Sequence, residues 1–352
     1  MYFLSLIMDN DTIKYYKWNI QESKILHKSC NTIMNLKASQ FYQPFYSLYF
    51  HIHNTKNSHK LIDIQRQYYV KQILSKKIQK YYNSNSFVKC LLFDSLRHST
   101  FEQEVFCKSL PLLDPLYFMM NNYNNTIKRN PMIPSCYNYN TFEKINKINN
   151  SSYIDTFFSF LGSEITRKNI LPCFPLYYGS VNGIQEDFNY DISDEYYDLK
   201  KEEWFYKNIG NTFSIHIYDD SSDDDDDDKK VDDDKKVDDD KKVDDIDSDD
   251  VSVDDDDIGT DDDDDKDSKD YDSCDYICSL KDIPTQLMFI EKLEGTLEDF
   301  LDDVDTLNTD VILSCMFQTS FSLCYLQKYY SFTHNDLHVN NIMYQKTDRD
   351  YL

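Results

Sequence analysis

A short polar stretch near the end of the sequence gathers residue types that can do chemistry. Residues 333–344 read Thr-His-Asn-Asp-Leu-His-Val-Asn-Asn-Ile-Met-Tyr, so that His334, Asp336 and Asn341 precede an apolar triplet. Phosphoryl transfer asks for little covalent work from a protein: a carboxylate must meet the acceptor hydroxyl, and a carboxamide oxygen can hold Mg²⁺. The spacing therefore indicates a phosphoryl-transfer loop, with Asp336 as the base and Asn341 as the metal ligand.

The segments on either side fit such a loop. Residues 310–330 carry apolar side chains at spacings of three and four, which predicts an amphipathic helix. The expected apolar face consists of Ile312, Met316, Phe317, Phe321, Cys324 and Tyr325. Residues 342–344 have strand character. The alternative interpretation is a capped helix followed by a polar hairpin, in which His334 and Asn341 serve only the turn.

One helix further upstream, residues 283–297 predict a strand, a turn and the start of a helix. The apolar run ends in Glu-Lys-Leu-Glu-Gly at 291–295. Thr296 and Asp299 are three residues apart, which is typical of a capping box in which each side chain bonds the backbone of the other. The helix that they begin is expected to continue through Leu301.

The first half of the chain predicts strands around one long helix. Residues 86–94 and 102–109 are β-prone and predict an antiparallel pair that carries Lys89 and Lys108. Both lysines are also compatible with ordinary strand positions whose ammonium groups lie in water. The other expected elements are a helix over 59–80, an Asn-rich loop over 121–150, a helix over 153–167 capped by Ser151 and Ser152, a strand over 172–179 closed by a turn at Gly179, and a strand over 212–218.

The charge of the chain is concentrated in one segment. The net charge is −26, but residues 219–272 hold 31 Asp against 8 Lys and account for −23 of it. A six-residue Lys-Lys-Val-Asp-Asp-Asp period recurs there, which is too polar to bury a core and predicts a disordered, extended insertion. A solvated spacer is the first interpretation, and an arm for basic proteins or divalent cations is the second. The nearly neutral remainder gives no reason to expect nucleic-acid binding.

The cysteines and the apolar runs indicate an intracellular, soluble protein. Nine Cys are dispersed, which favours a reducing compartment over a disulfide framework. Cys274 and Cys278 lack a second pair at zinc-site spacing, so a metal site there is a minor alternative. The opening apolar run is too short for a signal peptide, and no run is long enough to span a bilayer.

Together these segments resemble the eukaryotic-type protein kinase superfamily, and in detail the divergent kinase-like proteins of giant DNA viruses. The residues that carry the resemblance are Val105-Phe106-Cys107-Lys108, Pro111-Leu112-Leu113-Asp114-Pro115, Phe174-Pro175-Leu176-Tyr177-Tyr178-Gly179, residues 291–297 and His334-Asn335-Asp336-Leu337-His338. The A/T-biased composition and the Asp repeats fit a viral source, for which host cytoplasm or virion is the expected location.

The resemblance implies an α+β fold: a kinase-like N-lobe, a hinge and the beginning of a helical C-lobe, interrupted by the acidic insertion. The expected divisions are 1–84, of unassigned role, 85–218 for the N-lobe, 219–278 for the insertion, and 279–352 for the last N-lobe strand, the hinge and a truncated C-lobe with the catalytic loop. The implied activity is ATP-dependent transfer of a phosphoryl group to Ser/Thr hydroxyls, with ATP and Mg²⁺ as cofactors.

The resemblance also assigns residues. Lys108, with Lys89 as second choice, is expected to hold phosphates and to pair with Asp155 or, less well, Glu164. The remaining implied residues are Ile290 as gatekeeper, the backbone of Glu291 and Leu293 against adenine, Asp336 as base, Asn341 on Mg²⁺, and His334 and His338 within the catalytic loop.

Four departures from the family pattern limit what is expected. No Gly precedes Gly162, so the phosphate-covering Gly-rich loop is absent, and the helix acid is Asp where the family has Glu. His338 stands where Ser/Thr kinases usually carry Lys, which resembles small-molecule kinases. No Asp-Phe-Gly follows Asn341, so a second polypeptide is expected to complete the C-lobe. A pseudokinase or binding module with an acidic arm and a small-molecule phosphotransferase are the alternative functions.

Overall fold

The structure is a computed structural model, and it describes residues 13–52, 58–77, 84–123, 132–137, 141–219, 274–302 and 308–346. The chain divides into two compact units, one of residues 1–217 and 276–352 and the other of residues 218–275. Everything that follows concerns the first unit. Residues 220–273 of the expected insertion lie outside the described residues, whereas residues 274–278, also assigned to it, belong to a strand.

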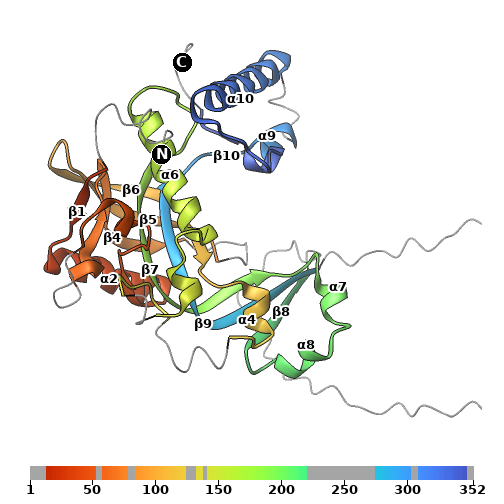
Figure 1. The fold of residues 1–352 in the computed structure, drawn as a ribbon. Coiled ribbons are helices and arrows are strands. Elements are labelled where there is room, and N and C mark those ends of the chain that lie inside the picture. The colour runs from red at the N-terminus through yellow and green to blue at the C-terminus, as the bar shows by residue number, and fades with distance from the viewer. Residues whose placement is uncertain are drawn as a thin grey trace, which may run out of the picture. The chain divides into compact units, whose positions relative to one another are not determined.

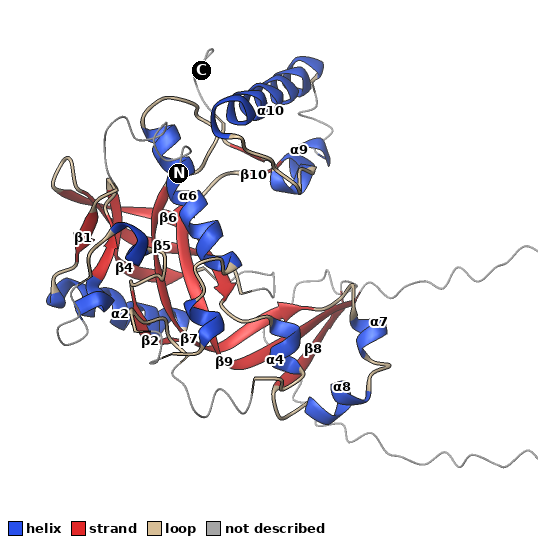
Figure 2. Ribbon diagram, viewed as in Figure 1, coloured by secondary structure: helices blue, strands red, loops and turns tan. Residues whose placement is uncertain are grey.

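Helices and short strands surround one seven-stranded sheet (Figures 1 and 2). In chain order the strands are β1 Tyr15–Lys17, β2 Leu36–Gln40, β3 Ile62–Ile64, β4 Tyr68–Lys76, β5 Ser86–Asp94, β6 Ser99–Pro111, β7 Tyr177–Asp191, β8 Phe213–Asp219, β9 Cys274–Glu291, β10 Gly295–Thr296 and β11 Met343–Tyr344. The helices are α2 Ile20–Met34, α3 Tyr46–Tyr49, α4 Pro115–Met119, α6 Ser151–Arg167, α7 Tyr196–Leu199, α8 Glu203–Asn208, α9 Leu297–Asp302 and α10 Thr309–Tyr330, with short 3-10 turns at η1 Ser58–Leu61, η3 Glu143–Asn146 and η4 Val339–Asn341.

The sheet is antiparallel at each pairing with a recorded register. Its order is β2-β7-β9-β6-β5-β4, and β8 pairs with β9. The expected antiparallel pair is present as β5 and β6, with Val88 opposite Val105. The α+β class expected from the sequence is confirmed at this level: a mixed fold with a curled antiparallel sheet and helices.

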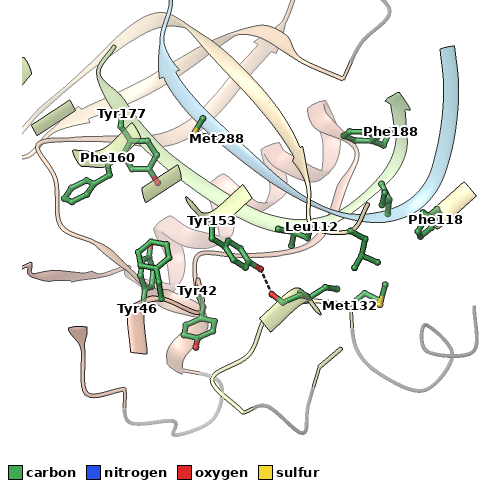
Figure 3. Packing of buried hydrophobic residues seen from close by; sticks show 14 of the residues in the cluster. Tyr42, Tyr46, Leu112, Phe118, Met132, Tyr153, Phe160, Tyr177, Phe188 and Met288 are labelled. Carbon is green, nitrogen blue, oxygen red and sulfur yellow. Dashed lines mark hydrogen bonds between the residues drawn. The ribbon is translucent and has the colours of Figure 1, made fainter. Parts of the chain in front are cut away.

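Alternation along the strands places a different core on each face of the sheet. On β5, Val88, Cys90 and Leu92 are all buried against α2, whose Leu26 and Cys30 belong to the same cluster. The second cluster lies against α6 and includes Tyr153, Phe160, Tyr177 and Met288 (Figure 3). Tyr153 is fully buried and its hydroxyl donates to the carbonyl of Ile145 at 2.8 Å, so its polar atom is satisfied.

A buried ion pair fastens the first part of the chain to the sheet. The guanidinium of Arg66 lies 2.9 Å from the carboxylate of Asp63, and both side chains are almost fully buried. The indole N–H of Trp18 and the hydroxyl of Tyr46 also donate to Asp63. The Arg66 Nε donates to the carbonyl of Tyr178 on β7 at 3.0 Å. Because every charge here is hydrogen-bonded, the pair is tolerated in the core.

Three sequence expectations about this region were wrong. The helix expected over 59–80 is instead η1, β3 and β4, because Tyr68, Tyr69 and Val70 pair with β5. The strand expected to end at a turn at Gly179 is β7, which starts at Tyr177 and continues to Asp191, with Gly179 inside it. The cap of α6 is Asn150, whose side chain accepts from Ser152 N–H, and the two serines lie within the helix.

Candidate functional site

Lys108 and Asp155 form the ion pair that the sequence predicted. The ammonium of Lys108, on β6, lies 2.7 Å from Oδ2 of Asp155, on α6. The exposed fractions of the two side chains are 39% and 35%, so the pair is open to solvent on one side. This geometry leaves the ammonium within reach of an anionic ligand while the carboxylate fixes its position.

Local structure explains why these two residues meet. Val105 and Cys107 point into the α2 core, so alternation directs Lys108 to the opposite face of the sheet, where α6 lies. Two hydrogen bonds tie the first turn of α6 to the end of β6: Ser152 Oγ donates to Pro111 O at 2.8 Å, and Asn150 Nδ2 donates to Leu112 O at 2.9 Å. Asp155 follows one turn later and is thereby brought over the strand.

The alternative candidates are engaged elsewhere. The ammonium of Lys89 lies 2.6 Å from Glu102, and about half of each side chain is exposed. Glu164 accepts from the guanidinium of Arg167 at 2.6 Å. Of the predicted lysines and acids, Lys108 and Asp155 are therefore the two that contact each other.

The segment after β9 contains the residues that the sequence predicted for a hinge. Ile290 is half-buried against the α6 core, and the N–H of Glu291 donates to the carbonyl of Leu176 at 2.8 Å. Among the described residues, none accepts a hydrogen bond from the N–H of Leu293. The N–H groups of Lys292 and Leu293 therefore both remain open among the described residues, whereas that of Glu291 is occupied.

Lys292, the residue between Glu291 and Leu293, is held by a group of ion pairs that the sequence did not predict. Lys292 lies 2.8 Å from Glu104 of β6, and Lys77 also reaches that carboxylate. Hydrogen bonds from Lys292, and next from Lys77, lower the pKa of Glu104 to about 2. The register of β6 against β9, with Val105 opposite Glu291, brings Lys292 close to Glu104. This ion pair could have been predicted only if the pairing of the two strands had been known.

The expected capping box begins the helix that follows. Asp299 Oδ2 accepts from the N–H of Thr296 at 2.8 Å, and Thr296 Oγ1 accepts from the N–H of Asp299 at 3.1 Å. This reciprocal pair starts α9 where the sequence predicted a helix.

The predicted loop collects its polar side chains around one amide. Asn341 Nδ2 lies 2.8 Å from Oδ2 of Asp336, 2.9 Å from the carbonyl of Asp336, and 2.9 Å from Nε2 of His338. The side chain of Asp336 is 79% exposed. His334 is half-buried beside the ring of Phe332, and among the described residues its Nδ1 has no hydrogen-bond partner.

One aromatic contact joins the helix of Asp155 to this loop. The ring of Phe158, one turn after Asp155 on α6, stacks on Phe332 with a centroid distance of 5.2 Å and an interplanar angle of 17°. Phe332 lies four residues before Asp336. The contact thus connects the helix of the Lys108–Asp155 pair to the loop that contains Asp336. In the sequence, Phe158 and Phe332 could be recognised only as apolar residues.

The buried face of α10 differs from the expected one. Leu326 and Tyr330 are the buried residues of the helix. Of the expected apolar face, Ile312 and Tyr325 are half-buried, whereas Met316, Phe317 and Phe321 are 62%, 69% and 53% exposed. Helical spacing identified the apolar residues but not which of them contact the rest of the chain.

The predicted loop contains oxygen atoms of the kind that bind Mg²⁺. The amide nitrogen of Asn341 makes the three contacts above, so its Oδ1 remains available beside the Asp336 carboxylate, and hard oxygen ligands suit Mg²⁺. Within the described residues, no group of three or more His, Cys, Asp or Glu is gathered, the Cys274–Cys278 region included. Mg²⁺ commonly keeps water and substrate oxygens, so two protein ligands are compatible with it.

Comparisons with known proteins give no family for the chain: no family model, curated protein or solved structure matches it. Among the helices of the described residues, none has both the length and the apolar character for crossing a bilayer.

Proposed function

We propose that this protein performs ATP-dependent phosphoryl transfer to Ser/Thr hydroxyls, as a divergent protein kinase-like protein. The observation that carries the proposal is the 2.7 Å ion pair between Lys108 and Asp155 on the strand and helix predicted to hold phosphates. The order of the elements supports it: Lys strand, acid-bearing helix, three further strands with two short helices among them, hinge, capped helix, long helix and polar loop.

Each candidate residue has a role consistent with its surroundings. Lys108 binds phosphate oxygens, and Asp155 holds its ammonium in place. Asp336 accepts the proton of the acceptor hydroxyl, and the amide of Asn341 orients that carboxylate. Positioning and electrostatic stabilisation are what this reaction needs from the protein.

Three residues of the hinge and three of the loop complete the proposed site. Ile290 lines the back of the nucleotide site, while Glu291 and Leu293 meet adenine through their backbones, the latter with its open N–H. In the loop, Asn341 would hold Mg²⁺ through its Oδ1, and the ion would supply charge stabilisation to the transferred group. His334 and His338 position the loop, the second through its contact with Asn341.

The proposal includes a helical polypeptide that covers α10 and supplies a second metal-binding carboxylate. Phe317 and Phe321 stack on each other at 5.9 Å with more than half of each side chain exposed. A contiguous exposed aromatic surface of this kind marks an interaction site more often than free surface.

Two alternative functions follow from specific observations. The 79% exposure of Asp336 and the lack of Gly before Gly162 favour a catalytically inactive binding module. The contact of His338 with Asn341, where Ser/Thr kinases usually carry Lys, favours a small-molecule phosphotransferase.

The deciding experiment measures binding and transfer separately. We expect Mg-ATP to raise the thermal midpoint of the chain, and Lys108→Met to abolish that shift, whereas Lys89→Met leaves it intact. Transfer of labelled phosphate to a Ser/Thr peptide mixture, with and without candidate partner polypeptides, is expected to disappear in Asp336→Asn but to persist in Asp198→Asn. Transfer to small hydroxylated acceptors alone would favour the phosphotransferase, and a chain that Mg-ATP does not stabilise is a binding module.

A further inference from the structure

A pocket of about 490 Å³ lies away from the residues discussed so far. Its lining comes from α4 and the turn after it, α8, the connection to β8, and β9 (Figure 1). The lining residues are Phe118, Asn121, Tyr123, Lys207, Asn208, Asn211, Thr212 and Lys281. The volume is in the range of pockets that hold small molecules.

The pocket is separate from the proposed nucleotide site. None of its lining residues is among the candidate residues above. Lys281 and Glu291 both belong to β9 and are ten residues apart in it. At about 3.3 Å per residue the two positions are on the order of 30 Å apart along the strand.

The charge of the lining is positive. Lys207 and Lys281 are exposed at their positions and no acidic side chain lines the pocket. Neither ammonium forms an ion pair with any residue that the structure describes, although Asp187 lies opposite Lys281 in the strand register. Two lysines in one concave site whose lining contains no acidic side chain favour an anionic ligand.

The remaining walls are neutral donors and aromatic rings held in place by the fold. Asn208 Nδ2 and Thr212 Oγ1 both donate to the carbonyl of Met119 at 2.9 Å, which ties α8 and the connection to β8 against α4. The buried ring of Tyr123 and the buried ring of Phe118 form the apolar part. The pocket is therefore preformed, and its lining combines two cations with two aromatic rings.

We propose that this pocket binds a small phosphate-bearing molecule, with the ammonium groups of Lys207 and Lys281 on the phosphate. A phosphomonoester on an organic body matches two cations beside amides and aromatic rings. A bare dicarboxylate would use the cations but leave the rings unoccupied.

The test titrates three probes into the full chain by calorimetry: AMP, ribose 5-phosphate and adenosine. We expect at least one phosphate ester to bind, and Lys207→Gln/Lys281→Gln to weaken it about tenfold or more, equivalent to about 1.4 kcal/mol. The matched control is Lys200→Gln/Lys201→Gln, which removes the same charge from neighbouring residues outside the pocket and is expected to leave the affinity within about twofold.

Lys108→Met separates this proposal from the nucleotide site. Binding of AMP or ribose 5-phosphate that survives Lys108→Met and is lost in Lys207→Gln/Lys281→Gln supports the pocket, even if Mg-ATP fails to bind the chain. Loss of binding in Lys108→Met, equal binding of adenosine and AMP, or no binding of either ester at millimolar concentration overturns it. Because both pocket lysines are exposed, circular dichroism of the double variant is expected to match the wild type.

Discussion

The ammonium of Lys108 lies 2.7 Å from the carboxylate of Asp155, and each side chain keeps more than a third of its surface exposed. An ion pair with this exposure contributes little to stability, of the order of 0–1 kcal/mol. Removing either partner should therefore leave the fold largely intact, so the ligand-binding role proposed for the pair can be tested separately from folding.

The first prediction follows from that relationship. Lys108→Met and Asp155→Asn are each expected to change the unfolding free energy by no more than about 1 kcal/mol, while reducing Mg-ATP affinity about tenfold or more. Urea unfolding and nucleotide titration on the same preparations measure both. Glu102→Gln, in the exposed pair with Lys89, serves as the control and should leave both quantities unchanged. A large loss of stability without loss of binding would assign the pair to folding.

The second prediction concerns the buried pair of Asp63 and Arg66. Removing one partner leaves an uncompensated charge in the core, so Asp63→Ala and Arg66→Met are each expected to cost about 3–5 kcal/mol of unfolding free energy. Chemical denaturation monitored by fluorescence gives the value, with the exposed pair variant Lys201→Met as the reference. A cost below about 1 kcal/mol for both variants would contradict the described network.

The third prediction compares two glycines with positive φ. A Cβ added at Gly179, where φ is +133°, would overlap the Arg66 guanidinium, whereas at Gly210, where φ is +78°, nothing lies within 4 Å. Gly210→Ala is expected to cost only the backbone term, about 1–2 kcal/mol. Gly179→Ala must also displace Arg66, so its cost should exceed that of Gly210→Ala by about 2 kcal/mol or more. Equal midpoints in thermal unfolding would refute this explanation.

The fourth prediction tests the stack between Phe158 and Phe332. Phe158→Ala removes a ring pair worth about 0.5–1.5 kcal/mol beyond burial, and we expect faster amide hydrogen exchange in residues 333–341. Phe317→Ala removes a ring that is 69% exposed on α10 and should leave that exchange unaffected. Unchanged exchange in Phe158→Ala would mean that the loop is held by other contacts.

The fifth prediction is a dependence of stability on pH. Burial lowers the pKa of His27 to about 4, and burial, helped by Lys60, lowers that of His59 to about 4. A histidine kept neutral in the fold takes up its proton more readily when unfolded, so its contribution is complete above about pH 6.5 and is lost as the pH falls toward 4. We expect each residue to account for up to about 3 kcal/mol over that interval. Urea titrations at intermediate pH values, with His27→Gln flattening the curve, provide the check; an equally steep curve in the variant is the contrary result.

Local patterns predicted the elements that carry the candidate site. Runs of β-prone residues identified β5 and β6, helical spacing identified α6, and the Thr296–Asp299 spacing identified the capping box. The pairing of Lys108 with Asp155 was expected only from the kinase resemblance, and the structure contains that ion pair. What these residues bind stays a prediction.

Features that depend on tertiary partners were not predictable in the same way. Leu61, Ile64 and Tyr68 fit a helical spacing, but pairing with β5 makes the Tyr68 region a strand. The sequence suggested that a strand ends at Gly179. In the structure Gly179 lies inside β7, where its lack of a side chain leaves space for the guanidinium of Arg66. On α10, apolar residues surround much of the helix, and only its contacts determine that Leu326 is buried while Phe317 is not.

β10 and β11 form a two-residue antiparallel ladder that joins two distant parts of the sequence. Gly295 pairs with Tyr344 and Thr296 pairs with Met343, so the chain just past the loop is anchored to the chain just past the hinge. The N–H of Leu297 also donates to the carbonyl of Ile342 at 2.6 Å, directly after Asn341. The ladder therefore fixes where the Asn341 amide lies relative to residues 295–297, although the two segments are more than 40 residues apart in the sequence.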